Sequence, residues 1–388
     1  MSVRIRVVQI IKNFSIESGG GGIERFGITL AQALDPLHFE SSVCGLWNAG
    51  TLFERERIRQ ISINGVKAFT AADWNETQPY QAFLQAYLGL RAWIAQNPVD
   101  ILHCHSEFAD MAVIPCGLKH RPAILRTVHN REWIKRPLRR LLLTNFLYPI
   151  IFRSELGVSM GIVETLNHRP LARLLRKQAL CIHNAVDLER FHNIKIDAVV
   201  KRADLGLPAD VPLIGTVGRL TRQKGYSFLI DAAARVLADL PQAYFVIVGD
   251  GEDAPALRSQ AARLGIADRV LFTGPREDVE ELLAIFTLFV SSSLWEGLPT
   301  VIMESMAAGV PVVATDISGT RELAVNNAIG WLVPAGNEQA LGAAILAALR
   351  DSSLQQLCVE RAHRMVQSFS MESVANEYAD LYTKIAEK

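Results

Sequence analysis

Two cations follow a strand-like segment in the second half of the chain. Arg219 and Lys224 lie just after the apolar run Leu213–Val217 and just before an apolar pattern with helical spacing. A guanidinium can hold a phosphate through two hydrogen bonds, and an ammonium adds a point charge. Gly218 lets the backbone approach an anion, and the N-terminus of a following helix favours negative charge. The segment indicates a diphosphate site without a metal, and the alternative is a solvated basic turn.

Two carboxylates lie eight residues apart in the segment SSSLWEGLPTVIMESMAAGVPVV. We expect Glu296 in a loop and Glu304 in a helix that begins near Pro299, because proline suits the first turn of a helix. Carboxylate oxygens accept hydrogen bonds from neighbouring hydroxyls, so this pair suits a sugar or a ribose. The alternative for Glu304 is an exposed helix residue, but a charge among apolar neighbours is seldom buried without a partner.

A glycine cluster, Gly19–Gly22, separates the strand-like run Arg4–Ile11 from the helical pattern Ile23–Leu34. Such a loop can bring backbone N–H groups close to a phosphate at the start of a helix. It is not a P-loop, because no Gly-Lys-Ser/Thr follows. A phosphate cradle and a flexible surface turn both remain open for this cluster.

Three histidines stand at or near strand ends. His129 follows the apolar strand Ala123–Val128 and begins a polar stretch, where it could bond a substrate, transfer a proton or be structural. His103 and His105 face one side of a strand, because side chains alternate along it. No third metal ligand is evident beside them, so a polar lining of a cleft is favoured over a metal site.

These residues need a scaffold that brings several strand ends together. Strand-like runs alternate with helical patterns, which indicates an α/β fold with parallel, doubly wound sheets. The first series of strands comprises Arg4–Ile11, Ser42–Leu46, Asp100–His103 and Ala123–Val128. The second series comprises Leu213–Val217, Tyr244–Val248, Val270–Thr273, Leu288–Ser291 and Val310–Ala314. We therefore expect two Rossmann-like domains, 1–190 and 191–370, and a final helical segment, 371–388.

Composition and cysteine usage exclude several classes of protein. The 388 residues are 49% hydrophobic and 21% charged, which is ordinary for a folded globular chain. The five cysteines are scattered without a C-x-x-C pair, so we expect no disulfide framework. This cysteine usage indicates a reducing compartment, and we therefore expect a cytoplasmic location. The N-terminal segment MSVRIRVVQI does not look like a signal peptide. The apolar run 141–152 is shorter than the roughly 20 residues that span a bilayer.

Charge is distributed unevenly along the chain. Residues 1–194 carry a net charge of +7, and residues 195–388 carry −7. The basic stretch Arg131–Arg140 precedes the apolar run Leu141–Phe152, a combination typical of contact with an anionic membrane surface. A helix that covers its own core is an equal alternative. No motif for binding nucleic acid is evident.

The motifs occur in an order that resembles the retaining glycosyltransferases of family 4. The matching segments cover nearly the whole chain: GGGGIERF, DILHCHS, RTVHN, LGVS, IHNAVD, VGRLTRQKG, VIVGDGED and SSLWEGLPTVIMESMAAGVPVVATDISGTREL. The last is the most specific, because Glu296 and Glu304 match the E-x7-E signature of the family. The resemblance implies the GT-B fold, in which two Rossmann-like domains face a deep cleft and a last helix returns to the first domain.

The resemblance implies a role for each matching residue. Arg219 and Lys224, beside Gly218, would bind the donor diphosphate and stabilise the leaving group, Glu296 would contact the donor sugar, and Glu304 would hold the ribose. The remaining donor-site positions would be Gly21, Gly22, Gly249, Arg276, Gly297 and Leu298, with the base near Gly249 and Arg276. His129 would stand beside the donor sugar. The family often has Glu-Gly-Phe-Gly where this chain has Glu-Gly-Leu-Pro.

The implied activity is transfer of a hexosyl group from a nucleotide-diphosphate sugar to a glycan or lipid-linked acceptor. The setting would be cell-surface polysaccharide biosynthesis, of the lipopolysaccharide or exopolysaccharide type. The implied chemistry retains the anomeric configuration, needs no metal and proceeds by attack on the face that the diphosphate leaves. A sugar-nucleotide epimerase and a non-catalytic nucleotide-sugar-binding protein are the alternatives, since one fold supports several functions.

Overall fold

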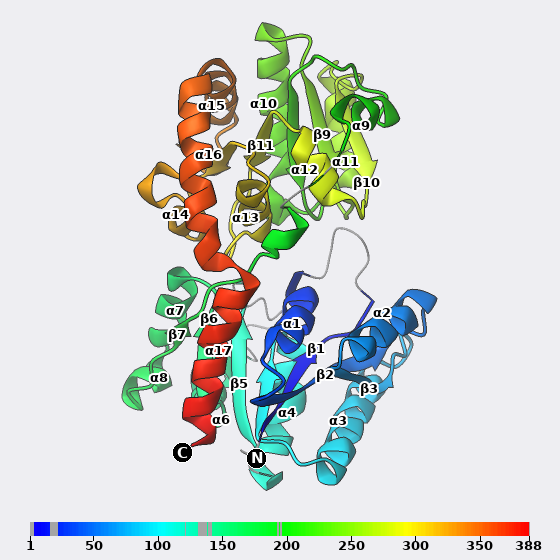
Figure 1. Cartoon of the computed structure of the whole chain (residues 1–388), viewed down its shortest axis with the longest axis vertical. Helices are drawn as coiled ribbons and strands as arrows, with labels where there is room; N and C mark the ends of the chain where they lie inside the picture. Colours follow the sequence, from blue (N-terminus) through cyan, green and yellow to red (C-terminus); the bar gives the residue numbers. More distant parts are fainter. Residues whose placement is uncertain are drawn as a thin grey trace. The chain divides into compact units, whose positions relative to one another are not determined.

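A computed structural model describes residues 4–15, 22–120, 122–130, 138, 142–191, 194 and 196–387 of the chain, with side chains omitted for 116–120. The described residues form two compact units. Unit 1 contains the chain up to Asn184 together with the segment from Met371 onward, and unit 2 lies within Ala185–Ser370. The last helix of the chain therefore belongs to the first unit (Figure 1).

Unit 1 is built on a parallel sheet of seven strands. In chain order the strands are β1 (Ile5–Ile11), β2 (Phe39–Asn48), β3 (Lys67–Asp73), β4 (Ile101–Cys104), β5 (Ala123–Val128), β6 (Ser154–Gly157) and β7 (Leu180–Cys181). Their order across the sheet is β3-β2-β1-β4-β5-β6-β7. The chain thus winds in one direction from β1 and then reverses between β1 and β4, where open sheets of this type bind ligands.

Helices cover both faces of the first sheet (Figure 1). They are α1 (Gly22–Ala33), α2 (Leu52–Ile63), α3 (Pro79–Gln96), α4 (Glu107–His120), the π-helix η1 (Leu143–Leu147), α6 (Tyr148–Ile151), α7 (Met160–Asn167), α8 (Pro170–Leu174) and α17 (Met371–Ala386). Apolar side chains of β1, β4, α3 and α4 form the main core of this unit. One face of α17 is buried and includes Val374, Tyr378 and Tyr382. These residues share that face because they are spaced four apart in the helix.

Unit 2 repeats this architecture with six parallel strands. They are β8 (Leu213–Val217), β9 (Tyr244–Val248), β10 (Val270–Gly274), β11 (Leu288–Ser291), β12 (Val312–Thr315) and β13 (Trp331–Val333). Their order is β10-β9-β8-β11-β12-β13, so the reversal here lies between β8 and β11. Strands buried on both faces read as nearly continuous apolar runs, which explains the sequences of β8, β9 and β11.

The helices of unit 2 alternate with its strands. They are α9 (Ala198–Asp204), α10 (Tyr226–Asp239), α11 (Ala254–Arg263), α12 (Val279–Ile285), α13 (Thr300–Ala307), α14 (Ser318–Leu323), α15 (Glu338–Arg350) and α16 (Ser352–Val366). Short 3-10 turns are η2 (Leu188–Arg190), η3 (Arg222–Lys224), η4 (Val325–Asn327) and η5 (Gln367–Phe369). The predicted α/β fold with two parallel Rossmann-like sheets is confirmed.

The membrane expectation rests mostly on residues outside this description. Of the basic stretch Arg131–Arg140, the structure describes only Leu138. Within the described part of the chain, no helix combines the length and the hydropathy that a membrane crossing requires.

Candidate donor site at the strand ends of unit 2

The loops after β8 and β11 meet because these two strands are neighbours in the sheet. The loop after β8 contains the short turn η3, which ends at Lys224. The loop after β11 carries Glu296 and leads into α13. The Lys224 ammonium lies 2.6 Å from Glu296 Oε1, so residues 72 positions apart form an ion pair.

The ion pair is held by neighbouring polar groups. Ser293 donates its hydroxyl to Glu296 Oε1 at 2.9 Å, and Gln223 donates its amide to Glu296 Oε2 at 3.1 Å. The side chain of Glu296 is 7% exposed and that of Lys224 is 22% exposed. The carboxylate is therefore fixed from several sides, while the side chain of Lys224 as a whole stays partly exposed.

The ammonium of Lys224 keeps its charge. Burial opposes the charged form, but the carboxylates of Glu296 and Glu304 outweigh this penalty and raise the pKa of Lys224 above its ordinary value. Glu304 lies half-buried on α13 and contributes to this field. The structure thus places all three predicted residues in one electrostatic neighbourhood.

Two glycines allow the strand ends to pack this closely. Gly225 has φ +63°, and a Cβ atom there would lie 2.2 Å from the Ser292 carbonyl oxygen. Gly249 has φ +127°, and a Cβ there would lie 2.1 Å from the Gly218 carbonyl oxygen. A larger residue would displace backbone at either position, so both glycines serve the close approach of loops at the sheet edge.

Other predicted residues of this unit surround the pair to different degrees. Gly218 adjoins it, because a Cβ at Gly218 would lie 3.3 Å from Lys224 Cε. Gly297 and Leu298 are buried in the turn before α13. Arg219 is exposed, and within the described residues its side chain has no hydrogen bond or ion pair. It is therefore a cation open to a ligand.

Arg276 is already engaged. Its guanidinium donates to both oxygens of Asp278, at 2.8 and 2.6 Å, and Lys201 bonds the same carboxylate. The hydrogen bonds from Arg276 are the main reason that the pKa of Asp278 lies far below its ordinary value. Arg276 would have to leave this pair, or share it, to contact a donor.

His129 of unit 1 lies at the end of β5 in a buried network of polar side chains. Its Nδ1 is 3.0 Å from Asn184 Oδ1, and its Nε2 is 3.3 Å from His105 Nδ1. The residue is 6% exposed, and the edge of its ring packs against Phe26 of α1. Both ring nitrogens are thus used by the protein itself.

The histidines of this network are neutral near pH 7. Burial lowers the pKa of His129 to about 4 and that of His103 to about 3. Burial also lowers the pKa of His105 well below its ordinary value, and the neighbouring histidines act in the same direction. His103 is buried beneath α17 and His105 against α1, whereas we expected both to line a cleft.

The glycine cluster is only partly described. Gly21 lies outside the described residues. Gly22 begins α1, and a Cβ there would meet no atom within 4 Å. The chain before the cluster is held by Glu54, which accepts backbone hydrogen bonds from Phe14 and Ala49 at 3.2 and 2.6 Å.

Sequence reasoning missed the groups that support these side chains. Gln223 and Ser293 position Glu296, and Asn184 and His105 position His129. Gln223 adjoins a predicted residue and Ser293 is three residues from another, which was an available signal. Asn184 is 55 residues from its partner, and nothing in the local sequence indicates that contact.

Comparison with known proteins places both units in one family. Residues 20–190 match the model of Glycosyltransferase Family 4, and residues 199–365 match Glycosyl transferases group 1. The lipopolysaccharide core biosynthesis glycosyltransferase LpsE of Rhizobium meliloti is 38% identical over 47% of this chain. That alignment spans 53% of LpsE, so it concerns about half of the relative's length.

Two further relatives cover more of the chain. The UDP-Gal:alpha-D-GlcNAc-diphosphoundecaprenol alpha-1,3-galactosyltransferase of Escherichia coli is 26% identical over 77% of this chain and 79% of its own length. The crystal structure of HepE from Anabaena in complex with UDP-glucose superposes with a TM-score of 0.82 at 23% identity. It covers 98% of this chain and all of HepE. With both family models matched, the chain belongs to the retaining glycosyltransferases of family 4 and has the GT-B fold.

Proposed function

We propose that the protein transfers a hexosyl group from a UDP-sugar to a glycan or lipid-linked acceptor during assembly of a cell-surface polysaccharide. The observation that carries the donor side is the fixed ammonium of Lys224, held among carboxylates beside the free cation Arg219. LpsE, named for lipopolysaccharide core biosynthesis, supports the polysaccharide setting, and the Escherichia coli galactosyltransferase, whose name gives a diphosphoundecaprenol-linked acceptor, supports the lipid-linked acceptor. The nucleotide follows the UDP donors named for the galactosyltransferase and for HepE.

The donor site supplies charge where the reaction develops it. Breaking the bond between the anomeric carbon and the phosphate oxygen leaves negative charge on the diphosphate. Lys224 and Arg219 would meet this charge, and cations already in place lower the barrier without reorganising during the reaction. Glu296 would then exchange part of its contact with Lys224 for the hydroxyls of the sugar. Glu304 would hold the ribose, and the neutral His129 of unit 1 would meet a sugar hydroxyl.

Nucleotide binding tests the donor side first. A thermal-shift panel with UDP, GDP, ADP and their sugar conjugates should show a selective shift with UDP and UDP-sugars. A ligand at 100 times its dissociation constant adds about 2.7 kcal/mol of stability. A selective shift with another nucleotide would overturn the choice of UDP. Conversion of the donor to its epimer without any acceptor would favour an epimerase, and binding with neither transfer nor hydrolysis would favour a non-catalytic protein.

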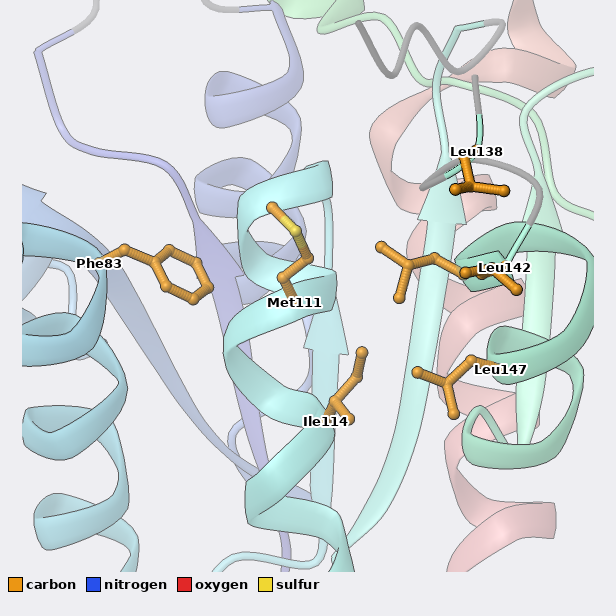
Figure 2. A pocket seen from close by; sticks show the side chains of 7 residues that line it. Phe83, Met111, Ile114, Leu138, Leu142 and Leu147 are labelled. Atoms are coloured by element: carbon orange, nitrogen blue, oxygen red, sulfur yellow. The ribbon is translucent and has the colours of Figure 1, made fainter. Parts of the chain in front are cut away.

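The acceptor side is supported by an apolar pocket in unit 1. Its volume is about 610 Å³, and Figure 2 shows side chains from α3, α4 and the segment around η1 that surround it. All seven lining residues are apolar: Phe83, Met111, Ile114, Leu138, Leu142, Leu143 and Leu147. Leu138 and Leu142 are 69% and 54% exposed, so the pocket is continuous with an apolar surface. We propose that it receives the hydrocarbon chain of a lipid-linked acceptor.

A charged side chain in the pocket tests this proposal. Leu142→Glu should abolish transfer to a polyprenyl-diphosphate-linked acceptor and retain slow hydrolysis of the donor. The control is Leu37→Glu, which places the same charge on another exposed leucine of unit 1. Cosedimentation with anionic vesicles at low salt tests a surface contact with the membrane. Equal transfer by both variants would remove the pocket from the proposal, and a failure to bind vesicles would remove the membrane contact.

A further inference from the structure

A continuous chain of hydrogen bonds runs from the C-terminal helix to His129. On the α17 side, the Tyr378 hydroxyl is 3.0 Å from Thr127 Oγ1, which is 2.8 Å from His103 Nε2. His103 Nδ1 is 2.6 Å from the Tyr382 hydroxyl, and Gln9 donates its amide to that hydroxyl at 3.0 Å. These groups lie on one face of the sheet, because Gln9 is directly opposite His103 in the pairing of β1 with β4.

The chain continues from Gln9 to the predicted sugar site. Gln9 Oε1 is 2.7 Å from His105 Nε2, and His105 Nδ1 faces His129 Nε2 at 3.3 Å. The last link joins His129 Nδ1 to Asn184 Oδ1. Each of the six ring nitrogens has one side-chain partner, and these rings form no other hydrogen bond within the described part of the chain.

Neutral histidines allow this chain to be satisfied in two ways only. A neutral imidazole carries one proton, so each ring donates at one nitrogen and accepts at the other. If His129 donates from Nδ1 to Asn184, its Nε2 must accept from His105 Nδ1. His105 Nε2 then accepts from the Gln9 amide nitrogen, and the Gln9 oxygen accepts from Tyr382. The Tyr382 hydroxyl in turn accepts from His103 Nδ1, so all three rings carry the proton on Nδ1. In the second arrangement every link is reversed, and all three rings carry the proton on Nε2.

The orientations of two amides select between these arrangements. With Gln9 donating to Tyr382 and Asn184 presenting its oxygen, His105 would donate from Nε2 and His129 would need protons on both nitrogens. A buried imidazolium is unfavourable, as the lowered pKa of His129 shows. A half-turn of either amide group removes the conflict, since it exchanges the oxygen and the nitrogen. The amide orientations of Gln9 and Asn184 are therefore linked through the rings of His105 and His129.

We propose that His103, His105 and His129 always share one tautomer, and that Gln9 couples them so that α17 and Asn184 together decide which nitrogen of His129 carries the proton. Gln9 is then a positioning residue, because it acts on His129 through His105. The value of this order for the sugar site rests on the proposed function. The shared tautomer itself does not, because it is a property of the protein without donor or acceptor.

Nitrogen-15 spectra of the histidine rings test the proposal directly. Protonated and bare ring nitrogens resonate far apart, and single histidine variants assign the signals. In the unliganded protein near pH 8 we expect all three rings to be protonated at Nδ1, or all three at Nε2. A mixture of tautomers among the three rings would overturn the proposal. The measurement needs no substrate, so a failure of the proposed function leaves its result intact.

Two substitutions should fix which ring nitrogens carry the protons. Asn184→Asp leaves only acceptor oxygens facing His129, so all three rings should carry the proton on Nδ1, including His103 at the far end. Gln9→Glu, at a pH where carbon-13 signals show the new carboxylate ionised, accepts from both neighbours. His105 and His129 should then be protonated at Nε2, and His103 at Nδ1.

A control variant tests whether the tautomers respond to Gln9 itself. Gln60→Glu makes the same chemical change on the exposed face of α2 and should leave the three tautomers as they are. If Gln9→Glu leaves all three rings alike, Gln9 is not the link and the proposal fails. If that variant does not fold, Asn184→Asp still decides, because a His103 ring protonated at Nε2 there contradicts the coupling.

Discussion

The two units share a strand order but place different chemistry at the ends of their strands. In unit 2, Lys224 and Glu296 form an ion pair in which the lysine side chain is partly exposed. In unit 1, neutral histidines and the Gln9 amide of the corresponding strands and loops meet tyrosines of α17, and these groups are buried. Topology therefore determines where polar groups collect, and the loops and covering helices determine whether those groups remain charged.

The two units differ in how the free-energy cost of burying a charge is offset. A buried charge requires a partner, and Lys224 has carboxylates on two elements that outweigh its loss of hydration. Within the described residues, His103, His105 and His129 bond no carboxylate, so the low dielectric keeps them neutral. The ionic edge suits a charged diphosphate, and the neutral edge suits the hydroxyls of a sugar.

Acid should destabilise unit 1 more than unit 2, and this is the largest effect that we expect. The folded pKa values of His103 and His129, about 3 and 4, lie below the unfolded value of 6.5. The unfolded state therefore binds more protons as the pH falls below about 6.5, and stability is lost until the folded pKa is reached. Each histidine contributes about 1.4 kcal/mol per pH unit within its window.

Hydrogen exchange checks this prediction. The protein is incubated at pH 7 or pH 4.5 and pulse-labelled at one common pH. Protection should be lost in α17 and β4 after incubation at pH 4.5, while α10 and β8 of unit 2 keep theirs. Simultaneous loss in both units, or no loss in α17, would contradict the contrast between a neutral and an ionic edge.

Removal of the fixed ammonium should have the next largest effect. Lys224→Ala should lower kcat about 10²- to 10³-fold, as expected when one preorganised donor to developing charge is lost. Arg222→Ala removes a cation from the same short turn but from an exposed side chain, and should change kcat little. Steady-state kinetics with saturating donor measures both, and circular dichroism verifies folding. Near-normal turnover by Lys224→Ala would refute its role at the leaving group.

Glu304 should affect binding more than chemistry. Glu304→Ala should weaken donor affinity by about 10- to 100-fold, because hydrogen bonds to a charged group contribute about 1.5–3 kcal/mol. Glu338→Ala removes a carboxylate from the first turn of another helix in unit 2 and serves as the control. Isothermal titration with the nucleotide sugar measures the affinities. Equal affinities in the two variants would argue against a ribose contact.

The tyrosines of α17 should show the smallest and most graded effect. Tyr382 bonds both His103 and Gln9, whereas Tyr378 bonds Thr127. At about 0.5–1.5 kcal/mol per hydrogen bond, Tyr382→Phe should destabilise the protein by about 1–3 kcal/mol and Tyr378→Phe by about half of that. Urea unfolding monitored by a probe in unit 1 measures the difference. A larger loss in Tyr378→Phe would reverse the assigned order of importance.

Much of the scaffold could be predicted from local sequence. β5, β8, β9 and β11 have the predicted bounds, because a buried parallel strand reads as a short apolar run between polar or turn residues. β3 was not predicted, since its residues KAFTAAD are only half-buried and weakly apolar. β13 has three residues and leaves too short a signal.

The candidate site was predicted in its residues but not in its contacts. Spacing places Glu296 and Glu304 near one helix, but it does not reveal that Glu296 pairs with Lys224 from another loop. The separation between His103 and Tyr382 is 279 positions, and that contact depends on the return of α17 to unit 1. Such long-range pairs follow from the sheet order, which a local pattern does not contain.

The position of α17 in the chain also has a consequence for biosynthesis. The helix that covers His103 and Gln9 is synthesised only after the whole of unit 2 has been made. At about 5–20 residues per second, unit 1 waits roughly 10–40 s for the segment that completes it. During that interval His103 and Gln9 have no tyrosine hydroxyl to bond. Nascent chains stalled before Met371 should therefore be the form that chaperones retain and proteases cut.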